Sequence, residues 1–77
     1  MKITREPDQL LVRKLIEKLS DKDPRVRRNA TGALRMQGLK AAVAVPAISR
    51  LLNDEDPRVR REAERAIEQL SPVPIHA

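Results

Sequence analysis

The sequence lacks the residue types on which most catalytic and ligand-binding chemistry depends. Its 77 residues include no cysteine, no Phe, Tyr or Trp, only two glycines and a single histidine. Without cysteine there is no disulfide, thiolate metal site or cysteine nucleophile, and His76 alone cannot form a histidine metal cluster or dyad. Without aromatic side chains there is no platform on which bases or sugars could stack. We therefore predict no enzyme activity, no cofactor and no metal site.

Long apolar segments are missing as well. No run of about 18 apolar residues occurs, so no segment is expected to span a membrane. The first seven residues contain no apolar stretch of the kind found in signal peptides. Together with the lack of cysteine, this favours a cytoplasmic location. The length predicts one domain over residues 1–77.

What the sequence does contain is an internal repeat. Residues 19–34 read LSDKDPRVRRNATGAL and residues 52–67 read LNDEDPRVRREAERAI. The second stretch follows the first at an offset of 33 residues, and ten of the sixteen positions are identical. A period of about 33 is typical of two-helix units that stack into solenoids. The pattern therefore predicts two repeats, at about 6–38 and 39–71.

Each repeat contains the signature of a helix start. An aspartate followed by a proline suits an N-cap and the first helical position, since Asp accepts bonds from free amides and Pro has no N–H to leave unsatisfied. These residues are Asp23 and Pro24 in the first repeat and Asp56 and Pro57 in the second. Apolar residues at helical spacing follow each start and also precede it. We predict an all-α solenoid fragment of four helices, at about 8–20, 24–37, 43–53 and 57–70, with an extended Pro-rich tail at 72–77.

The repeated pattern resembles the HEAT-like repeat family, in the short form also seen in proteins related to bilin-chromophore lyases. The matching pattern is Leu-x-Asp-x-Asp-Pro-x-Val-Arg-x-x-Ala-x-x-Ala, which begins at Leu19 and again at Leu52. The resemblance implies that the helices at 24–37 and 57–70 line the surface that meets a partner. It also implies ion pairs between successive repeats, which the matching residues would form: Asp21, Arg27, Asp54 and Arg60.

The net charge of +5 arises mainly in the first repeat. Residues 24–40 contain five basic side chains and no acidic one. The corresponding helix of the second repeat also carries three glutamates, so its arginines are predicted to be balanced by pairs such as Arg58–Glu62. The basic face that remains is a candidate partner site, made of Arg25, Arg28, Arg35, Lys40 and Arg61.

This basic face leaves several functions open. We expect a non-catalytic interaction or scaffold module whose face meets an acidic protein. Non-specific binding of nucleic acid or phosphate through the same arginines is the alternative, and its affinity would fall steeply with salt. A solvated or interface surface with no such ligand is the plain interpretation of the same charges. An accessory subunit of a lyase-like enzyme is a further class, implied by the resemblance alone.

Two repeats also leave apolar faces at both ends of the stack. Solenoids usually need about three repeats with polar caps, and the first helix has more large apolar residues than one packing face requires. We therefore expect a homo-oligomer, with a closed two-fold dimer as the commonest solution. Gly32, in mid-helix where the second repeat has Arg65, indicates either drift at an exposed site or close approach of another chain's helix.

Overall fold

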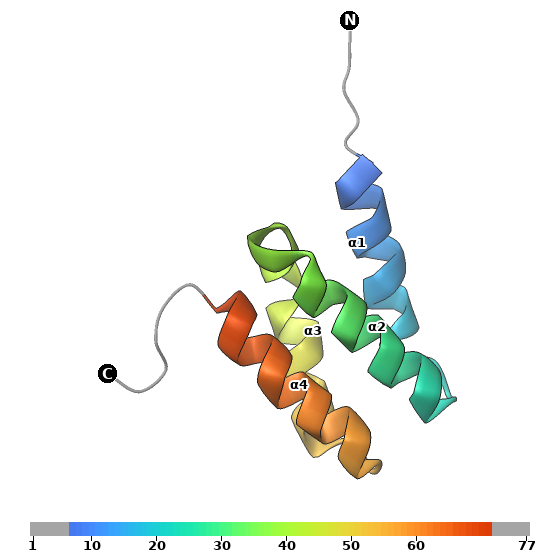
Figure 1. Ribbon diagram of the computed structural model, residues 1–77. Coiled ribbons are helices and arrows are strands. Elements are labelled where there is room, and N and C mark those ends of the chain that lie inside the picture. Colours follow the sequence, from blue (N-terminus) through green and yellow to red (C-terminus); the bar gives the residue numbers. More distant parts are fainter. Residues whose placement is uncertain (1–6, 72–77) are drawn as a thin grey trace, which may run out of the picture.

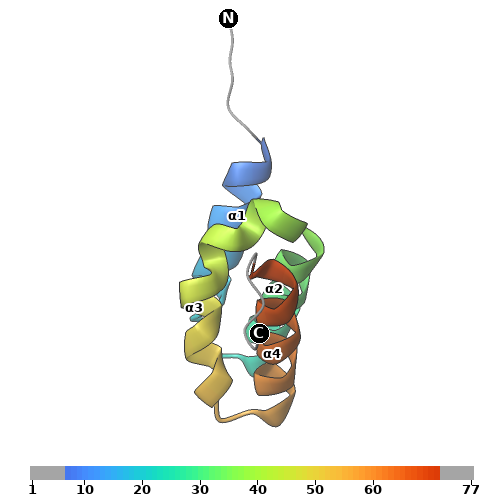
Figure 2. The same cartoon turned by 90° about the vertical axis from the view of Figure 1, so that its left-hand side faces the viewer.

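Four α-helices in two layers form the part of the chain, residues 7–71, that the computed structural model describes. Helices α1 (Pro7–Lys18) and α2 (Pro24–Met36) form the first hairpin, and α3 (Val45–Arg50) and α4 (Pro57–Leu70) form the second. Figures 1 and 2 show α2 and α4 side by side in one layer, with α1 and α3 in the other. No strand occurs in this range, and none of its helices is long and apolar enough to cross a membrane. The predicted tail at 72–77 lies outside the described residues.

Helices α2 and α4 begin in the same way. The carboxylate of Asp23 accepts the N–H of Arg25 at 2.9 Å, and that of Asp56 accepts the N–H of Arg58 at 2.8 Å. Both caps have extended backbone, and a proline is the first residue of each helix. Because the same local sequence starts both helices, and the helices run in the same direction (Figure 1), side chains 33 positions apart occupy equivalent places on neighbouring helices.

The segment between α2 and α4 differs from the single helix predicted over 43–53. Gly38 adopts the left-handed conformation with φ of 69° and ends α2. A 3-10 helix then runs over Gly38–Ala44, α3 follows, and a second 3-10 turn covers Leu51–Asn53. Pro46 lies in the first turn of α3. The α-helical part is short because Pro46 has no N–H with which to continue a hydrogen-bond ladder from the preceding turns.

Small and branched side chains form the core between the two layers. Leu34, Ile48, Val59 and Leu70 are fully buried. Alanines of α2 and α4 are buried beside them and allow close packing of the helices. Two leucines outside this core are exposed, Leu11 at 42% and Leu52 at 38%. No neighbouring repeat covers these two positions among residues 7–71.

Candidate functional site

A buried ion pair joins the two repeats. The Nε and Nη2 atoms of Arg27 donate to the two carboxylate oxygens of Asp54 at 2.8 and 2.9 Å, and Nη1 donates to the carbonyl oxygen of Asp21 at 2.7 Å. The side chains of Arg27 and Asp54 are only 10% and 7% exposed. Because the planar guanidinium meets both oxygens of the carboxylate, the bond restrains both the distance and the orientation of the repeats.

The other two residues implied for repeat stacking do not pair with each other. The carboxylate of Asp21 accepts the backbone N–H of Asp23 at 2.8 Å. Arg60 donates through Nη1 to the carbonyl oxygen of Asp54 at 2.6 Å. Within residues 7–71 no carboxylate lies at ion-pairing distance from the Arg60 guanidinium. Of the four implied residues, then, only Arg27 and Asp54 are joined through their charged groups.

Acid is expected to weaken the contact between the repeats through Asp54. Its hydrogen bonds with Arg27 hold the pKa of Asp54 below the ordinary value of 3.8. A depressed folded-state pKa means that this stabilisation is complete only well above the unfolded value of 3.8 and is lost as the pH falls through the folded value. Urea midpoints measured on titration into acid should therefore be flat above about pH 5 and then fall.

Asp54→Asn tests whether Asp54 causes this acid dependence, because asparagine has the same shape and does not titrate. It should show a shallower fall of the urea midpoint in acid. The remaining slope is expected from Asp23 and Asp56, whose pKa values are lowered by hydrogen bonds from the arginine two residues later. An acid slope in Asp54→Asn as steep as that of the wild type would contradict the assignment to Asp54.

A second bond between the repeats engages Arg35, a residue of the predicted partner site. Its Nε donates to Oε2 of Glu62 at 2.8 Å, and both side chains are partly buried. The predicted pair Arg58–Glu62 is therefore wrong, because Glu62 contacts α2 rather than a residue of its own helix. A signal for this bond was present in the sequence. Both Arg27–Asp54 and Arg35–Glu62 join residues 27 positions apart, so the second pair could have been inferred from the first.

Gly32 makes room for the Arg35–Glu62 bond. A Cβ atom at position 32 would lie 3.3 Å from Oε2 of Glu62, which is tighter than ordinary contact. Gly32 itself is half-buried. The helix that approaches this glycine is α4 of the same chain. Drift at an exposed site is thus wrong, and the close approach that the glycine allows is made by a helix of the same chain.

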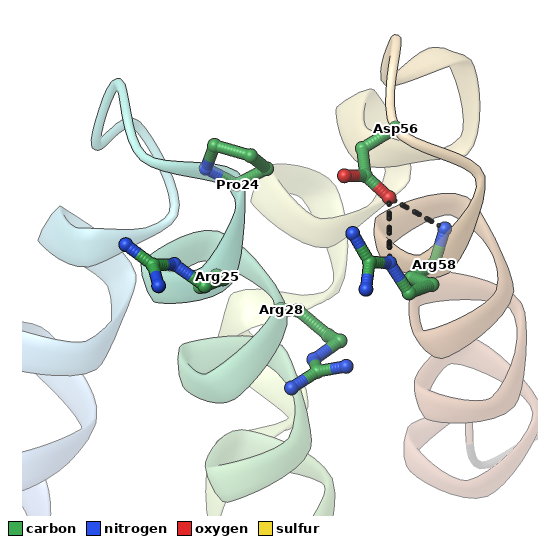
Figure 3. Close-up of a pocket in the computed structure, with 5 residues that line it drawn as sticks. All are labelled: Pro24, Arg25, Arg28, Asp56 and Arg58. Carbon is green, nitrogen blue, oxygen red and sulfur yellow. Dashed lines mark hydrogen bonds and ion pairs between the residues drawn. The ribbon is translucent and has the colours of Figure 1, made fainter.

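An open groove lies between α2 and α4, near the N-terminal ends of both helices. One hollow is lined by Pro24, Arg25, Arg28, Asp56 and Arg58. The adjoining hollow, of about 240 Å³, is lined by Arg28, Arg58, Arg61, Glu62 and Arg65. Figure 3 shows the side chains of Arg28 and Arg58 between the two helices, while that of Arg25 extends along the other side of α2. We call the four residues Arg28, Arg58, Arg61 and Arg65 the arginine groove.

The arginine groove carries an excess of positive charge. Among residues 7–71 no carboxylate lies at ion-pairing distance from Arg28, Arg61 or Arg65. The remaining member, Arg58, has its Nε 3.6 Å from the carboxylate of Asp56. Two acids line the hollows, and both are already bonded: Glu62 to Arg35, and Asp56 to the backbone N–H of Arg58. Such guanidinium groups can form bidentate hydrogen bonds with carboxylate or phosphate groups.

The structure brings together only part of the predicted partner site. Arg28 and Arg61 both line the groove. Arg25 is at its rim and contacts its own cap, with Nη2 3.1 Å from the carboxylate of Asp23. Lys40 follows the far end of α2, about 16 Å of helix away from Arg25. The sequence analysis missed Arg58 and Arg65 because their helix also carries glutamates at spacings that predict pairs within the helix.

No cluster of three or more metal-binding side chains occurs among residues 7–71. Two stacked helical hairpins, related by a 33-residue offset and joined by an arginine–aspartate bond, define an α-solenoid repeat protein. The family model for HEAT repeats matches residues 11–74, so the chain belongs to the HEAT repeat family. Among curated proteins and among solved structures, no match to the chain is found. HEAT repeats generally mediate protein–protein interaction or scaffolding and are typically non-catalytic.

Proposed function

We propose that this protein is a non-catalytic interaction module whose arginine groove binds an acidic segment of a partner protein. The observation that supports this most directly is the convergence of Arg28, Arg61 and Arg65 from two helices, with no carboxylate of residues 7–71 at ion-pairing distance. Like charges held together in this way favour a ligand that supplies the opposite charge.

The spacing of the groove suits an extended peptide. Arg28 and Arg61 are equivalent residues of neighbouring helices, whose axes are typically about 8–10 Å apart. An extended chain advances about 3.3 Å per residue. A segment that crosses α2 and α4 would therefore present carboxylates to both guanidinium groups from acidic residues about three positions apart. Each contact would be a charge-assisted hydrogen bond.

Binding of a nucleic-acid backbone is the second candidate, because the same guanidinium groups also suit phosphates. The composition favours the peptide. Without Phe, Tyr or Trp the chain has no aromatic side chain on which the bases of a single strand could stack, and that stacking supplies much of the affinity of single-strand binders.

Charge reversal in the groove tests the proposal. Arg28→Glu combined with Arg61→Glu should weaken binding of a fluorescent acidic peptide by about a hundredfold or more, since two charge-assisted bonds of about 1.5–3 kcal/mol each are replaced by repulsion. Fluorescence anisotropy measures the affinity, and a peptide with Gln and Asn in place of the acids should not bind. The control is Arg13→Glu with Lys14→Glu, two exposed residues of α1 that produce the same change in net charge.

The control variant, Arg13→Glu with Lys14→Glu, distinguishes binding at the arginine groove from attraction by the net charge of the protein. It should keep most of the peptide affinity, and circular dichroism should show both double variants to be folded. Equal loss in the two variants would mean attraction by net charge alone and would overturn the proposal. Binding of a single-stranded oligonucleotide, measured in the same way, tests the second candidate function. If the oligonucleotide binds while the acidic peptide does not, with log K falling by roughly 0.7 per neutralised phosphate against log salt, the second candidate replaces the first.

A further inference from the structure

The two ends of the repeat stack differ from the interior in a regular way. At one end, Leu52 is 38% exposed, whereas its counterpart Leu19, 33 residues earlier, is 4% exposed. Ile67 is half-buried at the same end, whereas its counterpart Leu34 is fully buried. An open hollow of about 260 Å³ lies over Leu52 and Ile67. Leu19 and Leu34 of the first repeat are covered by the second repeat. The equivalent residues of the second repeat, Leu52 and Ile67, are thus more exposed.

The opposite end shows the reverse pattern. Leu15 and Val26 are half-buried, whereas their counterparts Ile48 and Val59 are fully buried. Ile48 and Val59 share one core cluster with Leu19 and Leu34 of the first repeat, and no segment among residues 7–71 covers Leu15 and Val26 in the same way. Each end therefore displays one half of the interface that joins the repeats.

Each end also carries one residue equivalent to a partner in the Arg27–Asp54 ion pair. Arg60 repeats Arg27, and its Nη1 bond to the carbonyl of Asp54, at 2.6 Å, copies the bond of Arg27 to the carbonyl of Asp21, at 2.7 Å. Asp21 repeats Asp54, and both carboxylates accept the backbone N–H two residues later, at 2.8 and 2.9 Å. The two halves of a second arginine–aspartate pair are therefore held in place at opposite ends of the molecule.

We propose that copies of this chain stack end to end, with Arg60 of one copy bonded to Asp21 of the next. Leu52 and Ile67 of the first copy would then cover Leu15 and Val26 of the second, as the internal interface does. We call the surface of Leu52, Arg60, Glu64 and Ile67 the Arg60 end face, and that of Leu11, Leu15, Asp21 and Val26 the Asp21 end face. The contact is heterologous, so it extends the solenoid from copy to copy or closes a ring.

Charge complementarity favours this contact over the two-fold dimer expected from the composition. In a two-fold dimer each end face meets a second copy of itself, so Arg60 and Asp21 lie in separate interfaces and neither reaches the other. Opposite charges placed to meet across an interface favour the arrangement that brings them together. Only the contact between unlike end faces brings the arginine to the aspartate.

Glu64 makes the contact between copies weaker than the interface between the repeats of one copy. It stands at the position of Thr31, which is fully buried and donates its hydroxyl hydrogen to the carbonyl of Arg27 at 2.8 Å. Stacking would bury the charged carboxylate of Glu64 at a place where the internal interface buries only the hydrogen-bonded hydroxyl of Thr31. Burial of that charge without a partner is costly. The stacking is therefore reversible and concentration-dependent, and Glu64→Thr should strengthen it. A Glu64→Thr variant that remained monomeric at every accessible concentration would overturn the proposal.

Sedimentation velocity over a dilution series is the first test. The mean mass should rise beyond two chains as the concentration of the wild type rises. Arg60→Gln should raise the dissociation constant by about thirtyfold or more, the usual effect of removing one partner of a buried charge pair. Arg50→Gln is the matched control, because Arg50 and its counterpart Glu17 are exposed in both repeats, and it should leave the assembly unchanged. A wild type that is monomeric throughout, or a dimer that resists Arg60→Gln, would overturn the proposal.

A mixing experiment separates heterologous stacking from two-fold pairing. Leu52→Lys blocks the Arg60 end face, and Leu11→Lys blocks the Asp21 end face, and both leucines are exposed in the single chain, so folding is preserved. Each variant alone should be monomeric, and an equimolar mixture should form a dimer of one copy of each. Absence of that dimer, under conditions where the wild type assembles, would overturn the proposal. Acidic-peptide binding by the arginine groove is measured separately and does not depend on this outcome.

Discussion

Arg27→Ala is expected to lower the free energy of unfolding by about 3–5 kcal/mol, because it leaves the buried carboxylate of Asp54 without its counter-charge. A chain of this length has a total stability of about 4–12 kcal/mol, so the loss is a large share of it. Urea unfolding followed by far-UV circular dichroism measures the difference. The expected cost comes mainly from the unpaired charge and much less from the attraction of the pair itself.

The repeat provides the matched control for Arg27→Ala. Arg60 occupies the equivalent position and donates a bond to a backbone carbonyl, but no carboxylate among residues 7–71 pairs with it. Arg60→Ala should therefore cost only about 1 kcal/mol when it is measured at a concentration where the chain is monomeric. Equal losses in the two variants would contradict the assigned role of the Arg27–Asp54 bond.

Removal of both charges tests the same explanation from the other side. Arg27→Met combined with Asp54→Leu should recover most of the stability lost in Arg27→Ala, since apolar residues that replace a buried ion pair are often neutral or stabilising. A double variant as unstable as Arg27→Ala would mean that geometry, and not the unpaired charge, explains the loss.

Leu34→Ala is expected to cost about 2–5 kcal/mol, because Leu34 is fully buried and its truncation leaves a cavity between the repeats. The counterpart Ile67→Ala should cost only about 1–2 kcal/mol in the monomer, since Ile67 is half-buried at an open end face. Thermal or urea unfolding of both variants measures the contrast. A loss below about 1 kcal/mol for Leu34→Ala would contradict its place in the core.

The concentration dependence of the Ile67 variant links this prediction to end-to-end stacking. In the stacked state Ile67 would be covered as Leu34 is in the single chain. The cost of Ile67→Ala should therefore rise toward that of Leu34→Ala as the wild type assembles. The cost of Leu34→Ala should stay constant, because its environment lies inside one copy.

The arginine groove illustrates the limit of charge patterns read along one helix. Intrahelical pairing was assigned to Arg58 and Glu62 because they lie four positions apart, a spacing at which opposite charges attract. In the folded chain Glu62 instead bonds to Arg35 on the neighbouring helix at 2.8 Å. An exposed intrahelical pair contributes only a few tenths of a kcal/mol, so a well-oriented and partly buried partner on another helix readily replaces it.

The amino-acid sequence by itself determined the helical class, the 33-residue period and the starts of α2 and α4, because a cap depends on a few adjacent residues and a repeat is visible in the letters. Only the tertiary structure decided which charged residues are paired and which remain open. Packing α2 against α4 gave Arg27 and Arg35 their carboxylates and left the arginine groove without enough acid to balance it. Burial of one repeat by the next likewise made equivalent residues unequal, since Leu34 is covered and Ile67 is not.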